Sequence, residues 1–336
     1  MKISFVIPVY NAELYISRCV DSLLAQDIQD YEIICINDGS TDNSLAILKE
    51  YENKFPDKFI IISQENSGIA YARNNAFKYV KGDYTWFIDN DDCIHPNCLG
   101  KILDILEKNR IDILNIEYIK DSYQNNPFEN TFDELVKAEK VSQEKAMYFY
   151  SDAPWSKIYR TDFLRKNKLF FSDVYGEDTT ATFDLYSKTD KIYMLNKPLY
   201  AWYYRANSFS NSNLSKKHFE TFPEMLKILK CQSEKCPAHL KMYYDYLILR
   251  KADVYIPHIK RCDVSEDLKS LKIKCIQETQ KIIDQLYDNL FWNIHIKELE
   301  TISNAEEKIR LYYEKSLSWR ITKPMREFMK IIRKMK

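Results

Sequence analysis

The fold is constrained most strongly by residues 84–92, where an apolar run stops abruptly at a group of acids. Residues 84–88 are aromatic and β-branched, which is typical of a buried strand. Asp89, Asp91 and Asp92 follow directly. Because ligands bind beyond the carboxyl ends of the strands in an open α/β sheet, we expect these carboxylates to lie at the edge of such a sheet.

The carboxylates of this cluster repel one another unless a positive charge neutralises them. Mg²⁺ and Mn²⁺ are hard divalent cations that prefer oxygen ligands and often share them with substrate phosphates. The spacing of Asp89 and Asp91 therefore favours a divalent metal site. A solvated acidic turn is the alternative, since Asp-x-Asp is common by chance.

Apolar strand-like segments alternate with helical segments through the first part of the chain. We expect strands at residues 3–9, 31–37, 59–63, 84–88 and 112–119. We expect helices at residues 12–26, 44–55, 69–80 and 96–109. This alternation is typical of an α/β protein with a mostly parallel sheet and helices on both faces.

The later part of the chain is less regular. Residues 120–141 lose any periodicity, and residues 208–215 are rich in Ser and Asn and favour a linker. Between them we expect short helices and strands at residues 161–167, 179–187, 191–195 and 199–204. From His218 onward the pattern is helical. We therefore expect an α/β domain at residues 1–210, a helical domain at 211–315 and a basic tail at 316–336.

The composition excludes several other classes of protein. The 336 residues include 49 basic and 49 acidic side chains, so no overall field favours nucleic acid as a partner. The five glycines form neither G-x-G-x-x-G nor a P-loop. No apolar run reaches the ~20 residues of a membrane span. The eight cysteines form no Cys-x-x-Cys pair, and we expect reduced thiols, no secretory signal and a cytoplasmic location.

Three groups of acids close predicted strands or open predicted helices, at residues 38–42, 89–92 and 177–178. If the sheet is parallel, the first two groups share one edge. A metal at that edge, with a pocket at the end of the first strand, suits a substrate that carries a diphosphate. A separate carboxylate would accept a proton from an attacking hydroxyl.

The order and spacing of five motifs resemble those of glycosyltransferase family 2. The motifs are Pro-Val-Tyr-Asn at 8–11, Asn-Asp-Gly-Ser-Thr-Asp at 37–42, Glu-Asn-Ser-Gly at 65–68 with Ala-Arg-Asn at 72–74, Phe-Ile-Asp-Asn-Asp-Asp at 87–92 and Gly-Glu-Asp at 176–178. The resemblance covers roughly residues 1–210. It implies a GT-A (Rossmann-like) fold and inverting transfer of a sugar from a nucleotide-sugar.

The resemblance also implies roles for single residues. Asp89 and Asp91 would hold Mn²⁺ or Mg²⁺, with Asp91 the more direct ligand, and Asp178 would be the catalytic base. The residues implied in binding the nucleotide-sugar are Pro8, Val9, Tyr10, Asn11, Asp38, Gly68, Arg73, Asp89 and Asn90. The residues implied at the acceptor or the diphosphate are Trp155, Lys157, Glu177 and Arg205.

Each of these assignments has a structural alternative. Asp38 is also suited to cap the helix that follows it, and Asp178 to complement a helix dipole from the first turn. Glu177 would then only orient its neighbour. Trp155 is equally suited to the core, and Arg205 to a solvated loop.

The end of the chain has a different character. From Lys315 on, eight basic residues accompany a single acid, Glu327, and apolar residues recur at helical spacing after Pro324. This pattern favours an amphipathic helix on the anionic inner face of a membrane. A helix packed on the domain, or a dimer contact, is the alternative.

These observations predict a glycosyltransferase that moves a hexose or N-acetylhexosamine, most commonly from a UDP-sugar, to a hydroxyl of a glycan or lipid-linked acceptor in surface polysaccharide synthesis. A sugar-phosphate nucleotidyltransferase is one alternative, although the Gly-rich basic loop it needs is missing after residues 3–9. An inactive sugar- or partner-binding module is the other.

Overall fold

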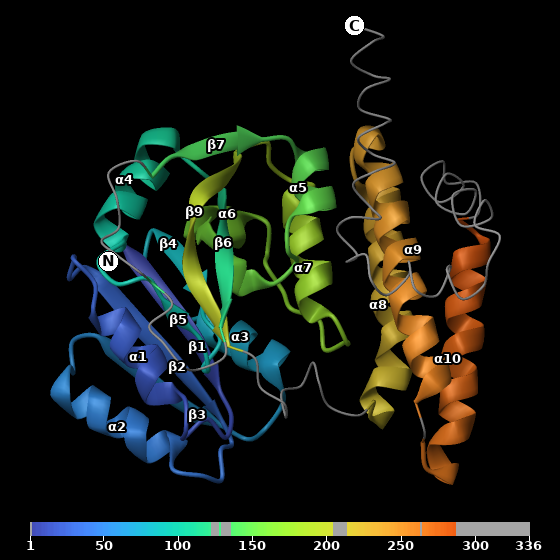
Figure 1. Ribbon diagram of the computed structural model, residues 1–336, viewed down its shortest axis with the longest axis horizontal. Coiled ribbons are helices and arrows are strands. Elements are labelled where there is room, and N and C mark those ends of the chain that lie inside the picture. The colour runs from blue at the N-terminus through green and yellow to red at the C-terminus, as the bar shows by residue number, and fades with distance from the viewer. Residues whose placement is uncertain (1, 122–127, 129–135, 204–213, 263, 287–336) are drawn as a thin grey trace, which may run out of the picture. The chain divides into compact units, whose positions relative to one another are not determined.

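The computed structural model describes residues 2–121, 128, 136–203, 214–262 and 264–286. The chain divides into two compact units, of which the first is Met1–Ile228 and the second begins at Leu229 (Figure 1). The predicted boundary at residue 210 and the predicted basic tail at 316–336 lie outside the described residues, so both stay predictions.

One mixed sheet forms the centre of the first unit (Figure 1). Its described strands are β1 Ile3–Val9, β2 Tyr31–Asp38, β3 Phe59–Gln64, β4 Tyr84–Phe87, β5 Cys93–Ile94, β6 Ile113–Asp121, β7 Ala138–Val141, β8 Lys157–Arg160 and β9 Ile192–Tyr203. Their order is β3-β2-β1-β4-β8-β6-β9-β5, and β7 pairs with β9. The first four strands are mutually parallel, and β8 runs antiparallel to both β4 and β6.

Parallel pairing brings the predicted motifs to one edge of the sheet. Val9 at the end of β1 pairs with Asn37 on β2, and Val6 pairs with Phe87 at the end of β4. The segments that follow these three strands therefore leave the sheet on the same side. Asp38 is the last residue of β2, and the segments after β1 and β4 carry Asn11 and Asp89, so the three lie at one edge, as the sequence predicted for a parallel sheet.

Helices cover the sheet and make up most of the described chain after it. Those of the first part are α1 Ile16–Leu24, α2 Ser44–Lys54, α3 Ile69–Phe77, α4 Leu99–Asn109, α5 Gln143–Phe149, α6 Thr161–Lys166 and α7 Glu177–Tyr186. They are followed by α8 Lys216–Lys235, α9 Ala238–Arg261 and α10 Glu266–Asp284, which confirm the helical C-terminal region. None of the helices that the structure describes combines the length and apolar character needed to cross a membrane.

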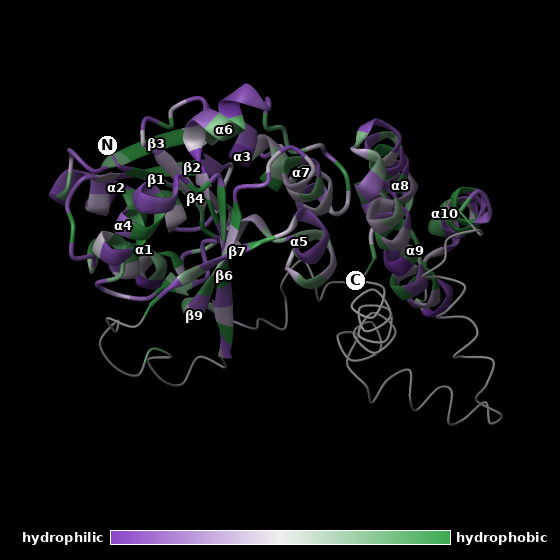
Figure 2. Ribbon diagram, turned by 90° about the horizontal axis from the view of Figure 1, so that it is seen from above, coloured by the Kyte–Doolittle hydropathy of each residue, from purple (hydrophilic) through white to green (hydrophobic). Residues whose placement is uncertain are grey.

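The alternation of side chains along the strands explains how both faces are covered. Ile3, Phe5 and Ile7 of β1 are fully buried in one hydrophobic cluster with α1 and α4. On the other face, α3 lies against β1 and β2. Figure 2 shows α1 and α4 on one side of the strands and α3 and α6 on the other. The α/β class predicted from the sequence is therefore confirmed.

Several element bounds differ from the sequence prediction. The strands expected at 191–195 and 199–204 are one strand, β9, whose pairing with β6 shifts register between Asn115 and Tyr118. Helix α4 begins at Leu99 instead of residue 96, because Asn97 adopts a left-handed φ of 54° and its N–H bonds to Ala25. The short elements β5, β7 and α5 were not predicted, since a few residues carry too little periodicity.

Candidate active site

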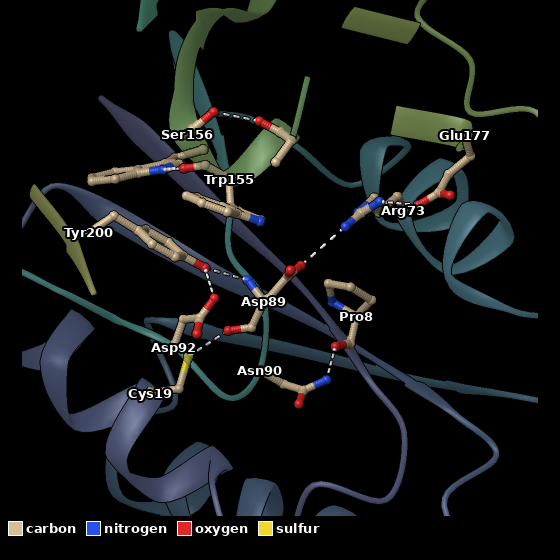
Figure 3. Close-up of polar contacts among 12 residues, drawn as sticks. Pro8, Cys19, Arg73, Asp89, Asn90, Asp92, Trp155, Ser156, Glu177 and Tyr200 are labelled. Carbon is tan, nitrogen blue, oxygen red and sulfur yellow. Dashed lines mark hydrogen bonds and ion pairs between the residues drawn. The ribbon is translucent and has the colours of Figure 1, made fainter. Parts of the chain in front are cut away.

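The loops after β1, β2 and β4 are hydrogen-bonded to one another at the edge of the sheet. Asn11 adopts a left-handed φ of 46°, and its Oδ1 accepts the N–H of Thr41 at 2.8 Å. Asn90 Nδ2 donates to the carbonyl of Pro8 at 2.8 Å (Figure 3). The ring of Tyr10 between them is 49% exposed, whereas Val9 is buried in the core. The loops therefore present one aromatic ring to solvent on a fixed backbone.

Asp38 organises the turn that precedes α3. Its Oδ1 accepts the N–H of Ser67 at 2.9 Å and Nε2 of Gln64 at 2.8 Å, and its Oδ2 accepts the N–H of Gly68 at 2.8 Å. Gly68 has a φ of 94°, a conformation that side chains rarely adopt. Asp38 does not cap α2, whose first N–H, from Ser44, is accepted by Asp42. Its predicted contact with the nucleotide stays a prediction.

Arg73 joins the acidic turn to the first residue of α7. Its Nη2 lies 3.1 Å from Asp89 Oδ1, and its Nη1 lies 2.8 Å from Glu177 Oε1 (Figure 3). Burial alone would lower the pKa of Arg73, but the carboxylates of Asp89, Glu177 and Asp178 raise it above its usual value. The buried guanidinium is therefore charged, and it partly neutralises the acids that converge on it. Its predicted contact with the nucleotide stays a prediction.

Asp92 anchors the acidic turn to β9. Its Oδ2 accepts the hydroxyl of Tyr200 at 2.8 Å and its Oδ1 accepts the N–H of Tyr203 at 2.9 Å. The same Tyr200 oxygen accepts the N–H of Asp89 at 3.1 Å (Figure 3). Burial, followed by the neighbouring charges of Asp91 and Asp89, raises the pKa of Asp92 well above its usual value. Asp92 is therefore a structural acid that fixes the position of the other two.

Asp89 and Asp91 provide the oxygen donors that fit a hard divalent cation. The second carboxylate oxygen of Asp89, Oδ2, accepts no hydrogen bond within the part of the chain that the structure describes. Oδ1 of the intervening Asn90 is buried and likewise has no hydrogen-bond partner. Among the described residues, no group of three or more His, Cys, Asp or Glu side chains is placed to hold a metal. Mg²⁺ is commonly held by one or two carboxylates together with substrate phosphates, and this donor set has that composition.

Asp178 lies in the first turn of α7. The preceding Gly176 has a left-handed φ of 79°, which turns the chain sharply into the helix. Asp178 Oδ1 accepts the N–H of Thr179 at 2.8 Å. This bond agrees with the alternative that Asp178 complements the helix dipole from the first turn. The negative charge of Asp178 raises the pKa values of Arg73 and Lys157, and so opposes burial, which lowers both. The half-buried carboxylate of Asp178 thus interacts electrostatically with both basic side chains. Its role as catalytic base stays a prediction.

The remaining predicted residues have distinct surroundings. Trp155 is buried and stacks on Tyr200, with ring centroids 4.5 Å apart and an interplanar angle of 14°. Lys157 is fully buried, and its ammonium group donates hydrogen bonds to two backbone carbonyls and one serine hydroxyl of the protein. Arg205 lies outside the described residues. The predicted contacts of these three residues with acceptor or diphosphate stay predictions.

Sequence reasoning missed Tyr200, which binds both ends of the acidic turn. It also missed Arg18, whose Nη2 donates to the carbonyl of Asp91 at 2.5 Å and whose guanidinium lies 3.7 Å from the ring centre of Tyr203. Neither residue belongs to a motif. A Tyr in an aromatic strand and an Arg in an amphipathic helix carry no signal that separates them from ordinary core and surface residues.

The arrangement agrees with the comparisons to known proteins. The family model described as Glycosyl transferase family 2 matches residues 4–175. This chain belongs to glycosyl transferase family 2 and is therefore a glycosyltransferase. The resemblance seen in the motifs is thereby confirmed.

Three relatives illustrate the similarity. The chain is 30% identical over 219 residues to the uncharacterized glycosyltransferase EpsJ of Bacillus subtilis, covering 62% of each protein. It is 36% identical over 197 residues to a poly(ribitol-phosphate) beta-glucosyltransferase of Bacillus spizizenii, covering 57% of this chain and 30% of the relative. It is 28% identical over 235 residues to the poly(ribitol-phosphate) beta-N-acetylglucosaminyltransferase TarS of Staphylococcus aureus, covering 68% of this chain and 40% of the relative. The chain thus spans about a third to two thirds of the length of these relatives.

Solved structures share the fold. Residues 1–349 of S. aureus TarS in complex with UDP superpose with a TM-score of 0.67 at 23% identity, over 84% of this chain and 81% of that one. The mannosyltransferase PcManGT of Pyrobaculum calidifontis, in complex with GDP-Man and Mn²⁺, gives a TM-score of 0.50 at 15% identity, over 86% of this chain and 87% of that one. These likenesses confirm the GT-A fold.

Proposed function

We propose that this protein is an inverting glycosyltransferase that moves a hexose or N-acetylhexosamine from a UDP-sugar to a hydroxyl of a glycan or lipid-linked acceptor in surface polysaccharide synthesis. The observation that carries the proposal is the Arg73 bridge, which brings Asp89 and the first turn of α7 to one buried cation. Family membership supports the reaction class. Two relatives are named for sugar transfer to poly(ribitol-phosphate), and TarS was crystallised with UDP and UDP-GlcNAc.

The donor binds at the edge formed by the loops after β1 and β2. Tyr10 offers an exposed ring for the nucleobase, and Asn11 fixes the backbone beside it through Thr41. Asp38 holds Gly68, so the turn before α3 stays open to the ribose. These residues bind and orient the nucleotide without taking part in bond breaking.

The diphosphate lies over the acidic turn. Asp89 and Asp91 would hold Mn²⁺ or Mg²⁺, which when bound offsets the charge that develops on the leaving diphosphate. Arg73 holds Asp89 by one oxygen, and the other accepts no hydrogen bond from any residue that the structure describes. Tyr200 fixes the backbone of Asp89 from the opposite side. The carboxylates therefore meet the donor in one preset geometry.

The acceptor hydroxyl is deprotonated by Asp178 as its oxygen attacks the anomeric carbon from the face opposite the diphosphate. Glu177 is already paired with Arg73 and therefore does not compete for this proton. The ion pair instead fixes the start of α7, and with it the backbone that carries Asp178.

Nucleoside diphosphate release tests the proposal. UDP-, GDP- and dTDP-sugars are incubated with the protein and Mn²⁺ or Mg²⁺, with and without chelator, and binding of each free nucleotide is measured by calorimetry. We expect slow hydrolysis of one UDP-sugar, abolished by chelator, and UDP binding that the other nucleotides do not match. Binding of UDP without turnover of any sugar, even with teichoic acid or lipid-linked glycan acceptors present, would favour an inactive binding module. Synthesis of a UDP-sugar from UTP and a sugar phosphate would favour a nucleotidyltransferase.

A further inference from the structure

Lys157 at the start of β8 is fully buried, yet all three hydrogens of its ammonium group have acceptors. Nζ donates to the carbonyl of Ser151 at 2.6 Å, to the carbonyl of Ala153 at 2.9 Å and to Oγ of Ser156 at 3.0 Å. A neutral amine has only two hydrogens and would leave one acceptor unpaired. The three acceptors therefore suit an ammonium group, although burial lowers the pKa of Lys157 to about 7. The side chain closes residues 151–156 into a compact loop.

The closed loop is attached to the first turns of α7. Asp152 lies between the two carbonyls that Lys157 binds. Its Oδ2 accepts the hydroxyl of Thr179 at 2.5 Å, and its carbonyl accepts the hydroxyl of Thr182 at 2.6 Å. Both threonines are buried and lie one and four residues after Asp178 on α7. Lys157 thus holds the backbone on both sides of Asp152, and Asp152 in turn binds α7.

We propose that Lys157 is a positioning residue for the proposed catalytic base: it clamps residues 151–156 and so fixes the first turns of α7 through Asp152. This inference deepens the proposed function and rests on it for the role of Asp178. It differs from the contact with diphosphate or acceptor that the resemblance implied, because the ammonium group is fully occupied inside the protein. An ordinary buried lysine would stabilise the fold without affecting Asp178 in particular.

The clamp is tested by hydrogen exchange, which needs no substrate. In Lys157→Met, we expect the amides of residues 179–183 to exchange at least about tenfold faster than in the wild type, with α2 unchanged. Thr182→Val removes the hydroxyl that binds the Asp152 carbonyl and Tyr159, keeps the Lys157 clamp, and should show a smaller effect in the same amides. Lys145→Met is the matched control, since Lys145 lies exposed on α5. Unchanged exchange at residues 179–183 in Lys157→Met would overturn the clamp, and a Lys157→Met protein that fails to fold leaves Thr182→Val to decide.

The effect on the proposed base is tested by the kinetics of UDP release from a UDP-sugar that the wild type turns over. In Lys157→Met, we expect kcat to fall about 100-fold with the donor KM within about twofold, because misplacement of a catalytic group affects the chemical step. Thr182→Val should lower kcat by a smaller factor. An unchanged kcat in Lys157→Met would contradict the inference, while turnover of no sugar by wild type would contradict the proposed function and leave exchange to decide the clamp.

Discussion

Arg73 and Glu177 are 104 positions apart in the sequence, and their side chains form an ion pair of 2.8 Å in the interior of the protein. The pair joins α3, which follows the turn held by Asp38, to the first residue of α7. Because the same guanidinium also binds Asp89, one buried cation connects the proposed metal turn with the proposed base. The site is therefore organised by charge neutralisation as much as by the sheet.

Arg73→Met should destabilise the protein and abolish activity. Removing the cation leaves Asp89 and Glu177 without their partner, and breaking a buried ion pair in this way costs about 3–5 kcal/mol. Urea unfolding followed by fluorescence measures this loss. Lys78→Met, at an exposed position just after α3, is the control and should change the free energy of unfolding by less than ~0.5 kcal/mol. Equal stability of the two variants would show that the bridge does not form in solution.

Tyr200→Phe should loosen the acidic turn while keeping the core packed. The variant loses the oxygen that accepts from Asp89 and donates to Asp92, whereas its ring still stacks on Trp155. We expect a loss of about 1–3 kcal/mol in unfolding free energy, because Asp92 becomes a buried acid with an unpaired oxygen. Tyr118→Phe is a close control, since that ring also contacts Trp155 and is half-exposed. If both variants unfold at the same urea concentration, the hydroxyl of Tyr200 has no such role.

Asp91→Asn should abolish metal-dependent UDP binding, whereas Asp92→Asn should leave it nearly unchanged. Asp92 is buried and its pKa is raised, so a neutral amide replaces it with little change in the turn. Asp91 is a proposed metal ligand, and its amide variant should lose the extra thermal stability that Mn²⁺ adds in the presence of UDP. Differential scanning fluorimetry with UDP, with Mn²⁺ or chelator, measures both effects. An Mn²⁺ effect that disappears in Asp92→Asn and persists in Asp91→Asn would reverse the assignment.

Lys157 should make the stability of the protein depend on pH. Burial lowers the pKa of Lys157 from 10.5 to about 7, although Asp152 and Asp178 act in the opposite direction. The unfolded chain therefore binds more protons than the folded chain between these values, and the contribution of Lys157 to stability rises with pH across that window. Urea unfolding at pH 6, 7, 8 and 9 should show wild type gaining stability relative to Lys157→Met. A difference that stays constant from pH 6 to 9 would mean that Lys157 titrates at its ordinary value.

The sequence contained much of the fold because the relevant signals are local. The apolar run before Asp89 and the alternation of strands and helices placed β1 to β4 and their edge correctly. Gly68 and Gly176, which the motifs place at turns, do adopt positive φ. The break expected within β9 at residues 196–198 was wrong, because pairing with β6 continues through it with a shift of register.

The partners of the site residues were beyond sequence reasoning because they are set by tertiary contacts. The spacing of Arg73 and Glu177 along the chain gives no indication that they meet. Lys157 was assigned to the acceptor or the diphosphate from the family resemblance, and the three acceptors around its Nζ come from residues whose proximity only the fold reveals. The role of Tyr200 was likewise not predictable, because the sequence does not distinguish it from the many other aromatic residues of the chain.

The most direct test of the account is the comparison of Asp178→Asn with Asp184→Asn, a substitution of the same kind later in α7. UDP binding is measured by calorimetry, and transfer from a UDP-sugar is measured by UDP release in the presence of acceptor. The account predicts that Asp178→Asn binds UDP as the wild type does but transfers about 10²–10⁴-fold more slowly, the range expected for loss of a general base, while Asp184→Asn keeps full activity. Wild-type transfer by Asp178→Asn would contradict it.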